Sequence, residues 1–379
     1  MQSLVRYNRS LTFYQQAYTS AVVNADGAVA VPLSSLSFTT ANTTHAYNVQ
    51  LNNFLEKLNA MRVKANLQYG NITTPNSAAR NAGVKIAREY ELADVMMGGK
   101  GTAGWTPAER AEILKTGKVP GEGHHLQNVA NHPEQQANPD NIKFYKTRDD
   151  HLKIGHGGNW QNESDQPIID KNNMLKKTNL KRVVKNELTG LGIAVAIGVG
   201  IGFSLSMITL LAQSGISLKT LKNAAIQSAK TGAEIGGQTV AAYGVGRVIG
   251  PIATKTVTHI ASKVLTVTSN ISKMINTGIV GTLTISMFSA YQFAKLKQNG
   301  VSTNEALYTI GKQAQSSLAI LTASLIAQGI WGGLAGIIFS SAICIYLLGS
   351  SVVSTVNQRK MMEKIQIYTI EKHYPSFAR

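Results

Sequence analysis

Residues 121–160 read GEGHHLQNVANHPEQQANPDNIKFYKTRDDHLKIGHGGNW and contain most of the chain's eight histidines. We expect this stretch to form two short strands and then a helix. The pair His124-His125 ends the first strand, and a loop rich in turn residues leads into a second strand with apolar residues at 142 and 144. The stretch therefore predicts a small β-hairpin in a chain whose other long segments have the pattern of helices.

The helix after the hairpin has a start signal of its own. Thr147 with Asp150 three residues later resembles a capping box, which places the helix start near Arg148. His151 then lies on the first turn, and His156 lies near the helix end, just before two glycines. Strand, strand and helix together predict a ββα arrangement with histidines on both parts.

This order of residues resembles the HNH, or His-Me finger, nucleases, in particular a branch with a Gly-His-His signature seen in bacterial toxin and conflict systems. The resemblance covers roughly residues 105–165. Its matching positions are Gly123, His124, His125, Asn141, His151 and the tail HGGNW at 156–160. It implies a ββα-metal endonuclease domain, which we place at residues 76–170, that hydrolyses phosphodiester bonds in DNA.

The resemblance also implies a role for each of these residues. His125 would be the general base, Asn141 would orient it, and His124, His151 and His156 would bind one divalent metal ion. Phosphodiester hydrolysis needs both a base and a cation that stabilises charge on the phosphate. Three imidazole ligands suit Zn, Ni or Mn, whereas Mg prefers oxygen, but the family often works with Mg or Mn. The metal therefore stays open among Mg, Mn, Zn and Ni.

One spacing departs from the family pattern. Family members commonly place the last two histidines four residues apart, on one helical face. Here His151 and His156 are five apart, which turns them away from each other on an ideal α-helix. We expect Gly155 to let His156 leave the helix and swing back toward the metal. Otherwise Asn159 or water takes its ligand position.

Composition is consistent with a polyanionic partner. The chain has 379 residues and a net charge of +17, which suits DNA or an anionic membrane face. Its single cysteine, Cys344, excludes a disulfide within the chain and a cysteine zinc knuckle. DNA contacts are expected from five cations near the hairpin: Lys115, Lys118, Lys143, Lys146 and Arg148.

The region before the hairpin is expected to be helical. Residues 1–75 are polar and form an N-terminal region of unknown role, with one clear helix at roughly 46–68 that carries an apolar stripe. A second helix is expected at 78–97, followed by a glycine-rich hinge at 98–101. The sequence Thr-Pro-Ala-Glu at 106–109 predicts a capped helix that ends near residue 117.

The second half of the chain changes character. Residues 171–187 are expected to form a basic linker, placed for DNA phosphates or as a juxtamembrane cluster; its cations are Lys171, Lys176, Lys177, Lys181, Arg182 and Lys185. Residues 188–358 form a glycine-rich hydrophobic domain, and residues 359–379 a basic tail. The hydrophobic domain has uncharged runs long enough to cross a bilayer at 191–212, 274–294 and, twice over, 313–358.

This hydrophobic domain is expected to be transmembrane. Four spans with both ends in the cytoplasm is our prediction, with 235–253 as a helix that does not span. Glycine pairs at four-residue spacing, such as Gly198/Gly202 and Gly246/Gly250, favour close helix packing in lipid. The alternative is a soluble, all-α domain packed through glycines within a homo-oligomer.

The sequence therefore predicts an α+β nuclease domain with a helical N-terminal extension, followed by an all-α hydrophobic, transmembrane domain. No signal peptide is expected at the N-terminus. We predict an HNH-type DNA endonuclease at the bacterial inner membrane, with the nuclease domain in the cytoplasm and a role in antiviral defence, because the nuclease precedes the hydrophobic half. Two alternatives are open: a delivered antibacterial nuclease toxin with a membrane-translocating half, and a membrane pore or scaffold with a non-catalytic metal hairpin.

Overall fold

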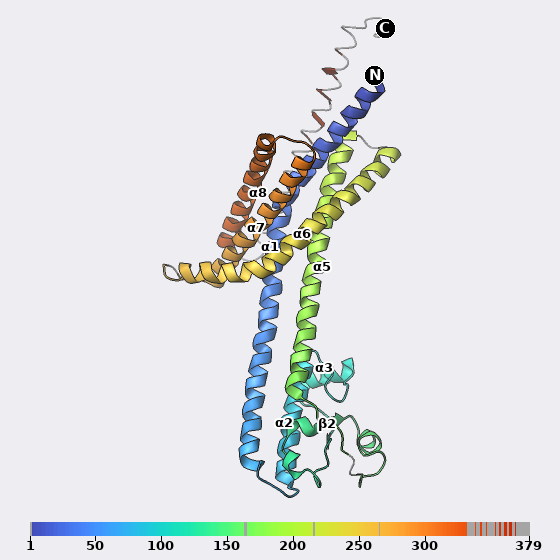
Figure 1. Cartoon of the computed structure of the whole chain (residues 1–379), viewed down its shortest axis with the longest axis vertical. Coiled ribbons are helices and arrows are strands. Elements are labelled where there is room, and N and C mark those ends of the chain that lie inside the picture. Colours follow the sequence, from blue (N-terminus) through green and yellow to red (C-terminus); the bar gives the residue numbers. More distant parts are fainter. Residues whose placement is uncertain are drawn as a thin grey trace. The chain divides into compact units, whose positions relative to one another are not determined.

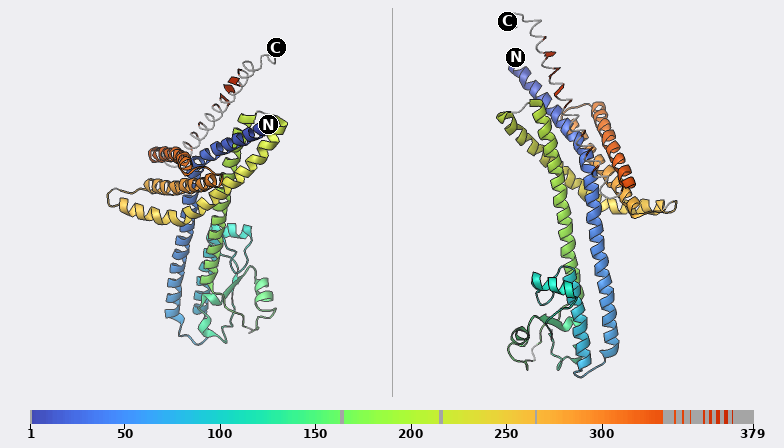
Figure 2. Two further views of the ribbon diagram at one scale, coloured as in Figure 1. Left: turned by 45° about the horizontal axis from the view of Figure 1, so that its top comes forward. Right: turned by 180° about the vertical axis from the view of Figure 1, so that it is seen from behind.

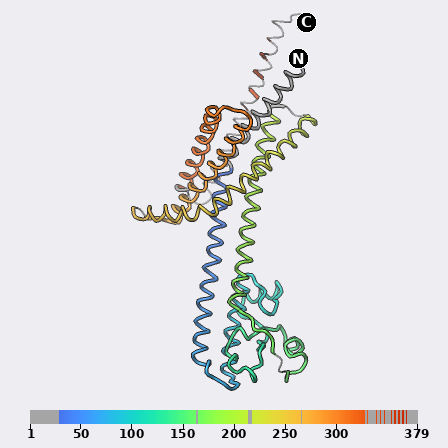
Figure 3. The backbone as a smooth tube through the Cα atoms, viewed as in Figure 1, coloured from blue at the N-terminus to red at the C-terminus, as the bar shows by residue number. Residues whose placement is uncertain are grey.

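The chain divides into two compact units. We call residues 42–187 the hairpin unit, and residues 1–41 with 188–379 the helical unit. The computed structural model describes the backbone of residues 2–162, 165–214, 217–264 and 266–331 and of scattered positions after residue 331 (Figure 3). Side chains are described from Val29 onward, except at 213, 214, 328 and 329.

Two long helices supply residues to both units (Figure 1). Helix α1 spans Gln2–Tyr69 and continues through Pro32, and α5 spans Lys171–Ser214. The helix expected at 46–68 is therefore the last part of α1. The segment 171–187, expected as a basic linker, forms the first part of α5.

The hairpin unit has a core made by three helices. Leu58 of α1, Tyr90 of α2 (Ser77–Met96) and Leu175 of α5 are buried together. The apolar stripe predicted on α1 packs here, which confirms it. Lys171 is fully buried, and its Nζ lies 3.8 Å from Glu91 Oε1. Because burial removes this ammonium from solvent, Lys171 cannot bind DNA or a membrane surface as the sequence suggested.

The glycine-rich segment after α2 is an anchored turn and not the expected hinge. Two buried carboxylates of α2 hold it: Asp94 accepts from the Gly101 amide at 2.8 Å, and Glu91 accepts from the Thr102 amide at 2.9 Å and from the Trp105 indole at 3.1 Å. Gly101 has a φ of +62°, and a side chain there would collide with Trp105. Local composition resembles a hinge, but tertiary hydrogen bonds fix the turn.

Helix α3 confirms its predicted caps. It spans Pro107–Thr116, begins with a capping box between Thr106 and Glu109, and ends at Gly117 in the left-handed conformation. Its Ile113 packs with Trp105 in the core beneath the hairpin.

The hairpin follows directly. Strand β1 (Glu122–His125) pairs antiparallel with β2 (Ile142–Tyr145), so that His125 faces Ile142 in the register. The loop between them contains two short 3₁₀ helices, η1 (Pro133–Gln135) and η2 (Pro139–Asn141). After β2, Thr147 caps the short helix α4 (Arg148–Asp150), which continues as a π-turn, η3 (His151–Gly155). The predicted ββα order and the helix start at Arg148 are confirmed.

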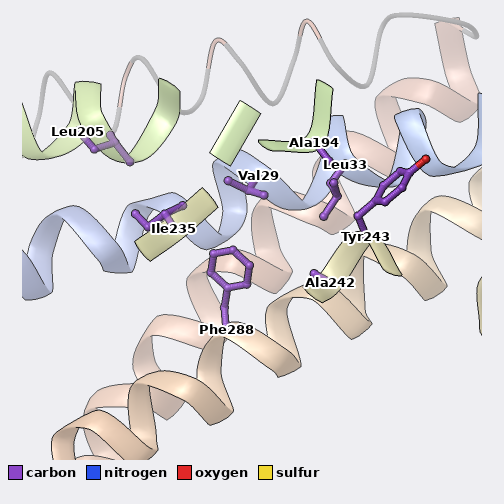
Figure 4. Close-up of a cluster of buried hydrophobic side chains, with 8 residues drawn as sticks. All are labelled: Val29, Leu33, Ala194, Leu205, Ile235, Ala242, Tyr243 and Phe288. Atoms are coloured by element: carbon purple, nitrogen blue, oxygen red, sulfur yellow. The ribbon is translucent and has the colours of Figure 1, made fainter. Parts of the chain in front are cut away.

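The helical unit contains α6 (Leu218–Ala261), α7 (Ser269–Gln298) and α8 (Thr303–Trp331) in addition to its parts of α1 and α5. Helix α6 packs on α7, and α7 packs on α8 (Figure 2). Its largest core cluster joins side chains from α1, α5, α6 and α7 (Figure 4): Val29, Leu33, Ala194, Leu205, Ile235, Ala242, Tyr243 and Phe288.

Glycines set the helix spacing in this unit, as the sequence predicted. A Cβ on Gly198 of α5 would lie 2.4 Å from Thr239 Oγ1 and 2.9 Å from the Cα of Gly236, both on α6. A Cβ on Gly246 or Gly250 would lie 2.9 Å from the Val280 side chain of α7. These glycines therefore allow contacts closer than any larger residue permits.

The described residues contain fewer candidate membrane spans than the four that the sequence predicted. Among the described residues, one helix, over Lys171–Ala212, is long and apolar enough to cross a membrane. The second half of the run expected to span twice at 313–358 and the basic tail at 359–379 fall largely outside the described residues.

Candidate metal centre and general base

Three imidazoles converge at the junction of β1 and the π-turn. Candidate ligand nitrogens of His124, His151 and His156 all lie within 4.8 Å of one another. The ring centroids are 5.1 Å apart for His124 and His151, 4.7 Å for His124 and His156, and 4.9 Å for His151 and His156. The three residues that the resemblance implied as ligands thus form one possible metal site.

The donor set fits a metal ion. Two nitrogens bound at 2.0–2.1 Å to a tetrahedral ion lie roughly 3.3 Å apart, and His124 Nδ1 lies 3.2 Å from His151 Nε2. His156 Nδ1 is buried and has no hydrogen-bond partner among the described residues. A buried ring nitrogen of this kind is costly unless something binds it. The cluster therefore has the geometry and the unused lone pair that a divalent cation would need.

The π-turn explains how two histidines five residues apart face one ion. On an ideal α-helix, five residues turn side chains about 140° apart. In η3 the His156 amide donates to the His151 carbonyl at 3.1 Å, an i→i+5 bond that brings the two residues onto one side. A Cβ on Gly155 would lie 3.0 Å from the His151 ring and 3.3 Å from His124 Nδ1. Gly155 therefore makes room for the imidazoles.

A carboxylate orients one ligand. Glu122 Oε2 lies 2.8 Å from His151 Nδ1 and accepts a hydrogen bond from its N–H. The other ring nitrogen, Nε2, is therefore unprotonated and faces the cluster. Such carboxylate–histidine–metal arrangements fix the tautomer and raise ligand basicity. The sequence analysis missed Glu122, although a signal was present: it is two residues before His124 on the same strand, and residues i and i+2 share a face.

Burial keeps two imidazoles of the cluster, His124 and His156, in the neutral form. Burial, with smaller contributions from the neighbouring His156 and His151 rings, lowers the pKa of His124 to about 3. Burial also lowers the pKa of His156, with a further contribution from His151. Neutral imidazole is the form that binds metal, so these groups need not lose a proton on binding at pH 7.

The fourth histidine, His125, is fixed separately. Its Nε2 lies 3.1 Å from the carbonyl oxygen of Gln136, which makes Nε2 the protonated nitrogen and leaves the Nδ1 lone pair free. Burial lowers the pKa of His125, the Gln136 hydrogen bond opposes this shift, and Arg80 and His151 add to it, so that the pKa is about 4. At neutral pH the ring is therefore a neutral proton acceptor of fixed tautomer.

Asn141 is fully buried and holds the loop between the strands. Its Oδ1 accepts from the Gln127 amide at 2.7 Å, and its Nδ2 donates to the carbonyls of Gln127 at 3.2 Å and Gln135 at 3.4 Å. These bonds fix the residue that precedes Gln136, the partner of His125. Asn141 is thus connected to His125 through Gln135 and Gln136 of the loop backbone. Gln136 itself carries no sequence signal, because its role depends on a carbonyl group.

The five cations expected to bind DNA have different surroundings. Lys146 pairs with Glu109 at 2.7 Å, and this bond, together with hydrogen bonds from Thr106, lowers the pKa of Glu109 to about 2. Lys115 and Lys118 are exposed on and after α3. The Lys143 ammonium lies 5.1 Å from the centre of the Tyr145 ring.

Arg148 lies beside Trp160 at the edge of the three-histidine cluster. Its guanidinium is 5.0 Å from the centre of the Trp160 ring and 3.8 Å from Glu122. Trp160, 43% exposed, also packs against the rings of His151 and His156. This arrangement places an exposed cation and an exposed aromatic ring next to the three imidazoles. His132, by contrast, pairs with Asp165 and lies outside the cluster.

Comparison with protein families finds a match within the hairpin unit. Residues 76–146 match the family model Tox-GHH, described as a GHH signature containing HNH/Endo VII superfamily nuclease toxin. The match runs from α2 to the residue after β2 and stops before His151 and His156, which the structure brings to the same site. The match supports a nuclease, which is a hydrolase that acts on nucleic acid, and the matched HNH/Endo VII superfamily is metal-dependent. No curated protein and no solved structure matches the chain.

Proposed function

We propose that this protein is a metal-dependent DNA endonuclease that is associated with a membrane. The observation that carries the nuclease proposal is the convergence of His124, His151 and His156 beside His125, whose tautomer is fixed. A divalent ion held by the three imidazoles would stabilise negative charge on the phosphate and on the leaving oxygen.

The chain's own residues have distinct tasks in this proposal. His125 Nδ1 takes the proton from the attacking water, while the Gln136 carbonyl holds Nε2–H. Asn141 keeps the loop that supplies this carbonyl in place, and Glu122 keeps His151 Nε2 unprotonated. Arg148, Lys143 and the other exposed cations near α3 would bind the phosphate backbone, so affinity should fall as salt rises.

The decisive experiment is cleavage of plasmid DNA by purified full-length protein with Mg, Mn, Zn or Ni, and with a chelator as control. Nicking that needs one of these metals supports the proposal. His132→Ala is a matched control, because His132 lies on the same hairpin loop but outside the cluster. Absence of cleavage with all four metals would contradict the proposal and favour a non-catalytic hairpin.

Membrane association is proposed from the distribution of side chains in the helical unit. Helices of water-soluble proteins bury their apolar face. Helix α6 follows this rule only in part: Ile235 and Thr239 are both fully buried, whereas Val248 and Ile252 are each 68% exposed. The same arrangement recurs in α8, where Ser317 and Ser324 are buried. An apolar surrounding suits such a surface, and a lipid bilayer supplies one.

Fractionation tests this part of the proposal. Full-length protein should sediment with membranes and resist both high salt and carbonate, because spanning helices do not dissociate, whereas attachment through basic residues is reversed by salt. Release by salt alone would indicate a surface-bound protein. Full solubility without detergent would indicate that copies of this chain cover the apolar surface in a homo-oligomer. On the membrane proposal, the nuclease domain lies on the cytoplasmic side of a bacterial inner membrane.

Two biological settings fit such an enzyme. Our proposal is antiviral defence, in which the enzyme cuts incoming phage DNA at the membrane. The second candidate is a delivered antibacterial toxin, which the family description "nuclease toxin" favours. Expression without phage separates them: a toxin should degrade the DNA of its own host unless an inhibitor is present, whereas a defence enzyme should act only on challenge.

A further inference from the structure

The carbonyl that fixes His125 belongs to a loop that is anchored at two ends. At the first anchor, the Gln136 side chain is only 1% exposed, its Oε1 accepts from the Asn76 amide at 2.7 Å, and its Nε2 donates to the Thr74 carbonyl at 3.1 Å. These partners lie between α1 and α2. The position of His125 therefore depends on a residue whose own side chain is held from outside the hairpin.

The second anchor is Asp140. Its carboxylate accepts from both terminal nitrogens of Arg62 in α1 and from the Lys171 amide at the start of α5, at 3.0 Å. Its backbone carbonyl accepts from the Ile169 amide at 2.8 Å. The Arg62 and Asp140 side chains are mostly buried, at 23% and 15% exposure. A partly buried bidentate pair of this kind fixes direction as well as distance.

A short path links Asp140 to His125. Asp140 precedes Asn141, whose side chain bonds to the Gln127 and Gln135 backbone. Gln135 precedes Gln136, which holds His125 Nε2. Displacement of Asp140 would therefore be passed to the imidazole along covalent neighbours and two hydrogen bonds, from Asn141 Nδ2 to the Gln135 carbonyl and from His125 Nε2 to the Gln136 carbonyl.

We propose that Asp140, held by Arg62 and by the start of α5, is a positioning residue for the general base His125. The inference rests on the proposed function. Arg62 and Lys171 both lie outside the family match at 76–146, so the catalytic unit needs parts of α1 and α5 that the family pattern does not contain. A nuclease with its base misplaced by about 1 Å loses roughly 100-fold in rate.

Two substitutions in the full-length protein separate positioning from simple stability. Arg62→Met removes both hydrogen bonds to Asp140 and keeps most of the apolar contact. Lys57→Met is the matched control, because Lys57 lies on the same helix and pairs with Glu89 of α2 at 2.7 Å, away from the loop. We expect Arg62→Met to lower kcat about 10- to 100-fold, with unchanged KM and metal content, and Lys57→Met to leave kcat within twofold of wild type. Arg62→Lys keeps the positive charge but not the two-nitrogen geometry of the guanidinium, so its kcat should be intermediate.

A double substitution tests the path itself. If Arg62 acts through His125, then Arg62→Met should cost little further rate once His125→Ala has removed the base. Plasmid nicking can follow the residual rate, because a general base contributes about 10²- to 10⁴-fold. An Arg62→Met variant as active as wild type, an unchanged penalty in the His125→Ala background, or loss of metal from Arg62→Met would each overturn the inference.

Wild-type protein in the same assay distinguishes failure of the proposed function from failure of the role of Asp140. If wild type does not cleave DNA with any metal, the proposed function has failed. If wild type cleaves and Arg62→Met cleaves equally well, only the role of Asp140 has failed. Should Arg62→Met not fold, Arg62→Lys in both backgrounds gives the same comparison with a smaller effect.

Discussion

The two units satisfy several of their buried polar side chains in different ways. In the hairpin unit, buried Asn141 and Glu91 bond to groups well away in the sequence. In the helical unit, the buried hydroxyls of Thr209, Thr239 and Thr284 each donate, at 2.8 Å, to the carbonyl four residues earlier on their own helix. Both solutions satisfy a polar group without water.

The difference separates two uses of polar burial. A contact between distant residues fixes one geometry, which a catalytic site needs. A hydroxyl bonded to its own helix fixes no neighbour, so it lets helices approach closely and leaves the apolar side chains outside. If this comparison holds, each unit can be damaged without harm to the other.

The largest expected effect is loss of the metal. His151→Ala removes a ligand nitrogen and the partner of Glu122, so it should weaken metal binding by more than the roughly 10- to 100-fold typical for loss of an outer hydrogen-bond partner. Cleavage should disappear, and sedimentation with membranes should not change. Metal content by mass spectrometry measures the effect, and an unchanged content would show that the ligand set is wrong.

His125→Ala should be nearly as severe for cleavage but harmless to the metal. Loss of a general base costs about 10²- to 10⁴-fold in rate. Because His125 Nε2 bonds to the Gln136 carbonyl and lies outside the three-imidazole cluster, metal content should match wild type. Nicking assays with metal analysis on the same sample check this. A variant with wild-type rate would remove His125 from the mechanism.

Glu122→Ala should give a smaller loss in the same unit. Without the carboxylate, His151 no longer has a fixed tautomer, and metal affinity should fall roughly 10- to 100-fold. Glu122→Gln keeps an acceptor oxygen and should recover part of the loss. Competition against a chromophoric chelator measures both affinities; equal affinity in Glu122→Ala and wild type would mean that the 2.8 Å contact does not support the ligand.

The smallest effect is expected in the helical unit. Gly198→Leu forces a side chain against Thr239 and the Gly236 backbone, and such overpacking typically costs about 1–3 kcal/mol. Thermal unfolding in detergent should begin earlier, while cleavage and metal content stay as in wild type. Gly192→Leu is the control, since a Cβ there meets nothing within 4 Å. Equal unfolding of both variants would refute close packing at Gly198.

Local signals in the sequence were sufficient for the elements around the hairpin. The capping box at Thr106 and the left-handed Gly117 depend on neighbours within a few residues, so the limits of α3 were predicted. The continuity of α5 through a lysine-rich segment was not, because it depends on Leu175 and Lys171 packing against α2. Nor does any local rule predict a helix that continues through Pro32.

The candidate site divides in the same way. Side-chain identity and order identified the histidines, since imidazole chemistry is visible in the sequence. The role of the Gln136 carbonyl could not be predicted, because every residue has a backbone carbonyl and only the fold determines which one contacts His125. The turn after His151 was also beyond reach: a five-residue spacing is unfavourable on an α-helix and acceptable on a π-turn.

The π-turn η3 allows the interval between two candidate ligand histidines to be longer by one residue. A histidine pair separated by four residues on an α-helix and one separated by five across His151–Gly155 can present the same two nitrogens to an ion. The extra residue is absorbed by a wider turn of the backbone, with Gly155 leaving space for the rings. A wider turn therefore accommodates one extra residue between two candidate ligand histidines, and a pattern search that demands the shorter interval would overlook this cluster.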